Sequence, residues 1–160
     1  MNFRRSRSRT GDAGVSLVEL VVTVAILGIL AGALVPIVKF TVKRQKELEL
    51  RRDLRMMRQA IDQYKKFCDT NVIQKNGVDS ECYPPDLDTL VDGVEKTGGL
   101  GQKIKFLRRI PIDPMTKTQE WGMRSFQDEA DSSSWGHENV YDVFTTSSGK
   151  ALDGTQYKDW

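Results

Sequence analysis

The sequence predicts an α+β fold in which one long N-terminal helix packs against a small antiparallel β-sheet. Three observations carry this prediction: a continuous apolar run over residues 17–38, a periodic apolar pattern that follows it, and two later segments rich in aromatic and β-branched residues. The chain has 160 residues and a formal net charge of +2. That length leaves room for one compact domain beyond the apolar run.

The apolar run of residues 17–38 contains one charged side chain, Glu19. As a helix it would be about 33 Å long at ~1.5 Å per residue, which is enough to cross a bilayer core of about 30 Å. Four arginines stand upstream of it, at positions 4, 5, 7 and 9. Because arginines before an apolar segment stay cytoplasmic, we expect the C-terminal part to cross the membrane. Residues 15–160 are close to electrically neutral, so we expect no nucleic-acid partner.

Glu19 is the feature of this run that needs an explanation. A charge in a membrane-spanning segment costs roughly 2.5–3.5 kcal/mol on insertion scales, and such residues are usually functional. A secretory signal cut near the small residues Ala31, Gly32 and Ala33 is one interpretation, and a plain membrane anchor is another. Neither gives the carboxylate of Glu19 a role.

Gly14 and Val15 after a short basic leader, with Glu19 four residues later, resemble the type IV prepilin motif. The resemblance implies that a membrane peptidase cuts after Gly14 and that the new N-terminal residue, Val15, is methylated. Glu19 would then be an assembly contact that pairs with the α-amine of a neighbouring subunit. That role is physically reasonable because a buried carboxylate is tolerable when it is paired. Val15 departs from the family pattern, in which phenylalanine is most common.

Pro36 lies deep in the predicted helix. A proline there removes a backbone hydrogen bond and bends the helix axis, so we predict a helix kink at this residue. Pilin-like helices commonly carry a proline at about this distance, and a simple membrane-helix kink is the alternative interpretation.

Beyond Lys39 the apolar residues become periodic, with spacings of three and four. This pattern predicts one helix from about Ser16 to Cys68, with an apolar stripe that packs on the domain's own sheet. The charged residues between the stripe positions, Arg51 and Arg58 among them, are expected to face solvent. The stripe consists of Leu50, Leu54, Met57, Ile61, Tyr64 and Cys68.

The rest of the chain predicts short elements. A short helix begins after Asp86, which is a good N-cap residue, and residues 104–107 carry a weak strand signal. Residues 119–126 and 139–145 are better strand candidates, separated by a polar loop. The C-terminal residues Leu152, Tyr157 and Trp160 are expected to pack onto the sheet.

Cys68 and Cys82 would lie in an oxidising compartment, where a disulfide closing a loop of about 15 residues is worth roughly 3 kcal/mol in the chain-entropy model. Two unpaired thiols are the alternative. The sequence has no Cys-x-x-Cys pattern, which gives a redox or zinc role little support.

Tyr83 with the two prolines after it, residues 106–114 and residues 140–144 together resemble the major (G-type) pseudopilins of type II secretion. The resemblance implies three parts. Residues 1–14 would be a cleaved basic leader, and residues 15–38 a transmembrane and filament-core helix. Residues 39–160 would be a periplasmic domain, with a spine helix over residues 39–68 and a globular part over residues 69–160.

The same resemblance implies a structural rather than an enzymatic role. The chain would be a single-pass inner-membrane protein that polymerises with its own copies into a periplasmic pseudopilus driving protein export. Its further partners would be minor pseudopilins, an inner-membrane assembly platform and the prepilin peptidase and methylase. A type IV pilin of a surface fibre is the runner-up, and a signal-anchored periplasmic enzyme or binding domain is the alternative from another class.

No cofactor is required by the sequence, although many G-type pseudopilins hold calcium in a C-terminal loop. Calcium needs six to eight oxygen ligands. Asp153 and Asp159 are the candidates here, and the acidic loop with Asp128, Glu129 and Asp131 is a second one. A solvated, turn-forming loop is the preferred interpretation. His137 is the sole histidine and is expected at the surface, which argues against a multi-histidine metal site or a catalytic role.

Overall fold

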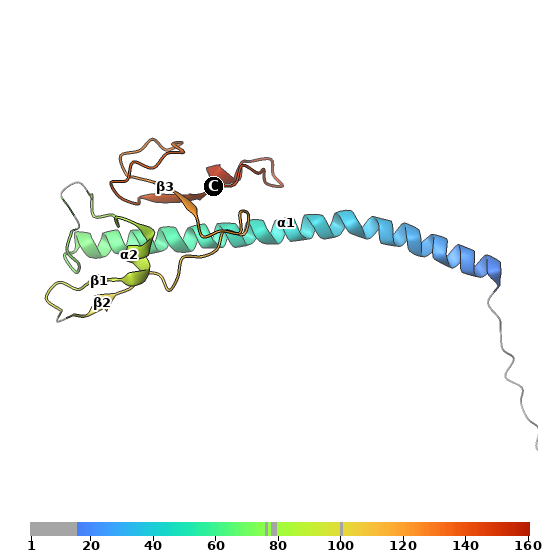
Figure 1. Cartoon of the computed structure of the whole chain (residues 1–160), viewed down its shortest axis with the longest axis horizontal. Coiled ribbons are helices and arrows are strands. Elements are labelled where there is room, and N and C mark those ends of the chain that lie inside the picture. Colours follow the sequence, from blue (N-terminus) through green and yellow to red (C-terminus); the bar gives the residue numbers. More distant parts are fainter. Residues whose placement is uncertain (1–15, 76, 78–79, 100) are drawn as a thin grey trace, which may run out of the picture. The chain divides into compact units, whose positions relative to one another are not determined.

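The computed structural model describes residues 16–75, 77, 80–99 and 101–160. Its elements in chain order are α1 (Leu17–Asp69), α2 (Leu87–Asp92), β1 (Val94–Glu95), β2 (Lys103–Ile104), β3 (Trp121–Arg124), β4 (Asp142–Thr145) and the short 3₁₀ helix η1 (Tyr157–Asp159). Figure 1 shows one long helix and small antiparallel sheets, which confirms the predicted α+β fold. The chain divides into two units, Met1–Thr41 and Val42–Trp160.

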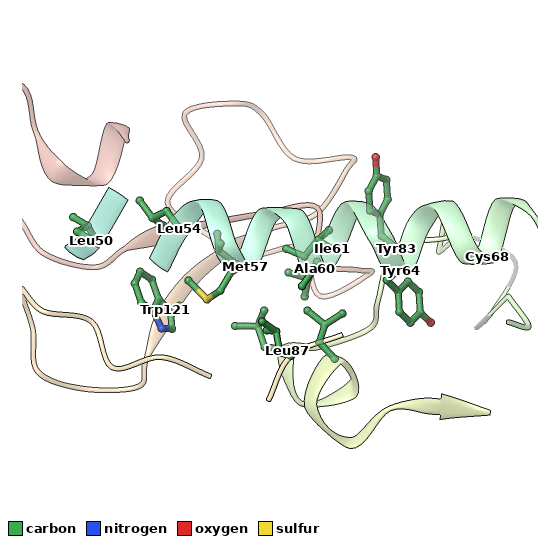
Figure 2. Packing of buried hydrophobic residues seen from close by; sticks show 14 of the residues in the cluster. Leu50, Leu54, Met57, Ala60, Ile61, Tyr64, Cys68, Tyr83, Leu87 and Trp121 are labelled. Carbon is green, nitrogen blue, oxygen red and sulfur yellow. The ribbon is translucent and has the colours of Figure 1, made fainter. Parts of the chain in front are cut away.

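The second unit is built around the apolar stripe predicted on α1. All six stripe residues are at most 3% exposed, which confirms the predicted core face of the helix. Figure 2 shows their side chains following one another along α1, with Trp121 and Leu87 contributed by other elements. Because this face is continuous, every other element of the unit can bury its apolar residues against one helix.

The strands form two separate two-stranded sheets rather than one. In the first, Val94 of β1 pairs with Ile104 of β2, and in the second Trp121 of β3 pairs with Thr145 of β4; both pairs are antiparallel. In Figure 1, the β3–β4 sheet lies on one side of α1 and the β1–β2 sheet on the other, while α2 overlaps α1 in this view. The two strong strand predictions are confirmed with shorter bounds, whereas β1 has no counterpart in the sequence analysis. Two-stranded sheets are marginal alone, so both depend on packing against the common core.

Helix α2 begins where the sequence predicts it. The carboxylate of Asp86 accepts a hydrogen bond from the backbone N–H of Thr89 at 2.7 Å, which is the expected N-cap contact. The helix then buries Leu87 and Leu90 and ends at Gly93, whose φ of 80° favours glycine. A side chain at Gly93 would also meet the carbonyl oxygen of Ile104.

The segment of residues 106–114 is fastened by a fully buried carboxylate, Asp113. One carboxylate oxygen accepts the backbone N–H of Met115 at 2.7 Å, and the other accepts the hydroxyl of Thr145 on β4. The indole N–H of Trp121 donates to the carbonyl of Pro111 at 3.0 Å. The two bonds of its carboxylate give Asp113 a structural role, since a buried carboxylate is tolerable only when it is hydrogen-bonded.

The prediction that Arg58 faces solvent holds only in part, because 36% of its side chain is exposed and the guanidinium is bound to β4. Its guanidinium bonds both oxygens of Asp142, at 2.6 and 3.3 Å, and also the main-chain oxygens of Val143 and Trp160. Arg124 reaches the same Asp142 carboxylate at 3.3 Å. Helical spacing places Arg58 beside the apolar stripe, where its long side chain can reach over the edge of the core to β4.

The C-terminal residues follow the prediction in part. Tyr157 is buried and Trp160 packs against the core, whereas Leu152 is exposed. Leu152 contacts α1 through its backbone N–H, which donates to Glu47, and its side chain is exposed.

Cys68 and Cys82 are joined by a disulfide, with 5.5 Å between their Cα atoms. The bond links the end of α1 to the residues that lead into α2, and Cys68 is itself a buried member of the core. The cross-link stabilises the domain chiefly by restricting the unfolded chain.

We predict that Ile61→Ala destabilises the second unit by about 2–5 kcal/mol, because Ile61 is fully buried in the middle of the stripe and its removal leaves a cavity. Chemical denaturation of the full chain in detergent, followed by near-ultraviolet circular dichroism, measures this loss. Leu48→Ala, at an exposed position of the same helix, is the matched control and should change stability by less than about 0.5 kcal/mol. Equal effects of the two changes would contradict the packing described above.

We predict that the native protein has no thiol that reacts with an alkylating reagent before reduction. After reduction two alkyl groups should add, and the Cys68→Ser, Cys82→Ser double variant should lose roughly 2–4 kcal/mol of stability. Mass spectrometry before and after reduction measures the first effect and denaturation the second. Alkylation of the unreduced, folded protein would show that the disulfide is not formed.

Candidate functional site

Glu19 lies in the first turn of α1 and is exposed. The backbone N–H of Leu20 donates to the carbonyl of Ser16 at 3.0 Å, so the helical pattern is already established at this point. A carboxylate in the first helical turn is favoured by the helix dipole, by about 0.3–1 kcal/mol at an exposed position. The backbone therefore holds a negative charge at a defined place near the start of the helix.

The side chains around Glu19 form an apolar surface that the described part of the chain leaves open. From residue 17 to residue 30 the large apolar side chains are between 50% and 77% exposed. Apolar surfaces of this extent mark contacts with other proteins or with lipid. The residues are Leu17, Val18, Leu20, Val21, Val22, Val24, Ile26, Leu27, Ile29 and Leu30.

This surface determines what Glu19 can do. None of the ion pairs within the described residues involves Glu19. If a second molecule or lipid covers the surrounding apolar side chains, the carboxylate leaves water with them and needs a cation as a partner. The arrangement therefore selects for a positively charged group on whatever covers this part of α1.

Three further predictions concern this part of the chain: the processing site, the helix kink and the transmembrane segment. Gly14 and Val15 lie outside the described residues. Pro36 lies within α1, and the kink predicted there stays a prediction. Within the residues that the structure describes, no helix combines the length and the apolar character needed to cross a membrane. The transmembrane prediction for residues 15–38 is therefore not confirmed.

The calcium candidates of the C-terminal loop do not fit a calcium ion. One oxygen of Asp153 accepts both the N–H and the hydroxyl of Thr155, at 2.9 and 2.6 Å, and the other lies 3.5 Å from the guanidinium of Arg51. The Thr155 bonds and then Arg51 hold the pKa of Asp153 below its usual value. Asp159 is an exposed residue of η1. Calcium takes six to eight oxygen ligands, whereas one oxygen of Asp153 already accepts two hydrogen bonds from Thr155 and the other lies beside the positive charge of Arg51.

The second calcium candidate is likewise part of a closed loop. Asp128 accepts the backbone N–H of Ser125 at 2.6 Å and that of Gly136 at 3.1 Å, and these bonds lower its pKa. Glu129 and Asp131 are exposed. Within the described ranges no group of three or more histidine, cysteine, aspartate or glutamate residues could hold a metal ion.

Several residues that organise these loops were not identified from the sequence. Asn139 is fully buried. Its side-chain oxygen accepts the backbone N–H of Phe126, and its side-chain nitrogen donates to the side-chain oxygen of Gln127. Its backbone carbonyl accepts the indole N–H of Trp135. Glu47 accepts the hydroxyl of Tyr157 at 2.9 Å. An asparagine or a glutamate within a polar stretch carries no sequence signal of burial, so these contacts become visible only in three dimensions.

His137, the only histidine, is exposed, as predicted from the sequence. Its ring lies 4.1 Å from the ring of Trp135. Its backbone φ of 65° places it at a turn of the polar loop. The contact of His137 with Trp135 is therefore a packing contact within the polar loop.

Comparison with known proteins identifies two similarities. The family described as "Prokaryotic N-terminal methylation motif" matches residues 9–35, a range that includes Gly14, Val15 and Glu19. Type II secretion system core protein G of Pseudomonas aeruginosa is 31% identical over 111 residues, which cover 66% of this chain and 70% of that protein. No solved structure matches the chain.

We predict that the second unit loses stability between about pH 10 and pH 12 through Tyr157. Burial and the neighbouring Glu47 carboxylate raise the pKa of Tyr157 to about 12, whereas an unfolded tyrosine titrates near 10. Because the folded pKa is the higher one, the stabilisation is complete below about pH 10 and is lost as the pH rises through the folded pKa.

Denaturation of the wild-type chain and of Tyr157→Phe across this pH range checks the prediction. The Tyr157→Phe variant should be less stable at neutral pH and should show a smaller loss between pH 10 and 12. Parallel pH profiles of the two proteins would contradict the assignment.

Proposed function

The chain belongs to the family of type II secretion major pseudopilins, and from this premise we propose that it is a structural subunit of a pseudopilus. In this proposal the leader is removed after Gly14, Val15 becomes the methylated N-terminal residue, and the mature chains polymerise to drive protein export. The single observation that carries the proposal is the lone carboxylate of Glu19 on the exposed apolar helix surface of residues 17–30. The methylation-motif match over residues 9–35 supports the processing step.

The role of Glu19 in assembly follows from electrostatics. Cleavage after Gly14 would create an α-amino cation on Val15, close in sequence to Glu19. When copies pack side by side through their apolar helices, a carboxylate of one subunit can pair with the amine of the next. Such a pair is specific in position because a buried charge without a partner is costly, so it would set the axial register of each added subunit.

We propose that the chain is held in the inner membrane by residues 15–38 before it enters the filament, with the C-terminal domain in the periplasm. The exposed apolar side chains of α1 and the four arginines of the leader support this orientation. The disulfide between Cys68 and Cys82 fits an oxidising compartment for the domain.

The partners in this proposal are further copies of the chain, minor pseudopilins, the inner-membrane assembly platform and the peptidase that also methylates Val15. We assign the chain no catalytic role. A pseudopilus is preferred over a surface fibre because the similarity is to a type II secretion component, not to an adhesive pilin.

We predict that the mature protein begins at methylated Val15. Intact-mass measurement of the chain purified from cells that contain the prepilin peptidase should give the mass of residues 15–160 with one added methyl group. Loss of the small residue on which cleavage depends, as in Gly14→Leu, should leave the leader attached. An uncut wild-type chain, or cleavage near Ala33, would overturn the processing step.

We predict that Glu19→Leu is processed normally but fails to assemble, because it removes the buried charge partner and keeps the apolar character of the helix surface. Chemical cross-linking in cells and electron microscopy of sheared filaments measure assembly, and intact mass measures processing. Thr23→Val is the matched control: its hydroxyl bonds the carbonyl of Leu20 within the same helix, so it should assemble as the wild type does. Normal filaments from Glu19→Leu would remove the proposed role of the carboxylate.

A further inference from the structure

Residues 149–160, which we name the C-terminal loop, close on themselves through short-range contacts. The N–H of Ala151 donates to the carbonyl of Thr155 at 2.8 Å, and the N–H of Gly154 donates to the carbonyl of Ala151 at 3.1 Å. The carboxylate of Asp153 caps this turn through Thr155. The loop is therefore a preformed turn.

Three side chains of α1 hold the loop in place. Glu47 accepts the backbone N–H of Leu152 and the hydroxyl of Tyr157, both at 2.9 Å. Arg51 lies 3.5 Å from the Asp153 carboxylate, and its guanidinium lies 4.0 Å from the centre of the Trp160 ring.

The third is Arg58, which donates to the main-chain oxygen of Trp160 at 2.8 Å and at the same time binds Asp142 on β4. The spacings of four and seven residues place Glu47, Arg51 and Arg58 on one face of the helix. They contact the loop near its middle and at its last residue.

The contacts differ in strength. The Arg51–Asp153 pair has both side chains about half exposed, at 53% and 52%, so the charge attraction contributes little. The Glu47 contact is stronger because Tyr157 is 4% exposed and its hydroxyl would lose a hydrogen-bond partner in the protein interior. Glu47 thus holds the loop more strongly than Arg51 does.

We propose that Glu47, Arg51 and Arg58 act as a clasp that fastens the C-terminal loop to α1 without a divalent cation. In pseudopilins that hold calcium in this loop, the ion would supply such a closure. Here one oxygen of the Asp153 carboxylate already accepts two hydrogen bonds from Thr155, and the positive charge of Arg51, which would repel a cation, lies 3.5 Å from the other oxygen. The clasp lies within one chain, so this inference is independent of filament assembly and of the processing of Gly14.

Limited trypsin digestion of the full chain in detergent tests the clasp, because Lys150 and Lys158 are exposed residues of the loop. Cleavage at these two lysines is followed by mass spectrometry, with excess calcium chloride and with excess EGTA. We expect equal rates in the two solutions. Calcium that slows cleavage of the wild-type loop several-fold would overturn the proposal.

The Glu47→Leu variant should be cleaved at Lys150 and Lys158 roughly tenfold faster than the wild type, in both solutions, because two hydrogen bonds to a charged group are lost. Glu47→Gln, which keeps an oxygen acceptor, should be cleaved at an intermediate rate. Glu49→Leu, an exposed carboxylate two residues along the helix, is the matched control and should be cleaved as the wild type is.

Cleavage at Lys65 and Lys66 on α1 distinguishes local opening of the loop from unfolding of the whole unit. The clasp requires that Glu47→Leu leave these two rates unchanged. A wild-type rate of loop cleavage in Glu47→Leu, or an equal acceleration at the loop and at α1, would contradict a clasp that acts on the C-terminal loop.

Discussion

The apolar stripe on the second half of α1 is the constraint on which the rest of the domain depends. Its two sheets have two strands each, with two or four residues per strand, and such sheets are not stable alone. Trp121 and Val143 of β3 and β4 belong to the same buried cluster as the stripe, and Val94 and Ile104 of β1 and β2 pack against that cluster. Loss of a stripe residue therefore weakens the core that both sheets share, and the disulfide at Cys68 reinforces the end of the same stripe.

Polar side chains beside the stripe decide how the remaining segments are arranged. Arg58 joins α1 to β4 and to Trp160, and Glu47 receives the C-terminal loop. Asp113 performs the same task away from the helix by joining its own segment to Thr145. In each case one charged group satisfies several neighbours, which gives these contacts specificity of position beyond their modest net energy.

The two halves of α1 differ in what covers their apolar side chains. Between Leu50 and Cys68 the protein covers them itself, and between Leu17 and Leu30 it leaves them open. Surface that is buried within one chain cannot be used for contacts between chains, so in the proposed filament the open part of α1 is the surface available for assembly. Glu19 is the charged exception on the open surface, and an exception of this kind can select one alignment among many that apolar packing alone would allow.

The sequence by itself determined the course of α1, its apolar stripe, the Asp86 cap of α2 and the prepilin-like N-terminus. Each of these depends on residues close together in the chain, where periodicity and capping chemistry act directly. Tertiary structure alone decided that the sheet is two separate pairs, that Arg58 turns inward to Asp142, and that Glu47 holds the C-terminal loop. The contacts of Arg58 and Glu47 join residues about 80 to 110 positions apart, and a charged residue on a helix looks the same in sequence whether water or a distant partner satisfies it.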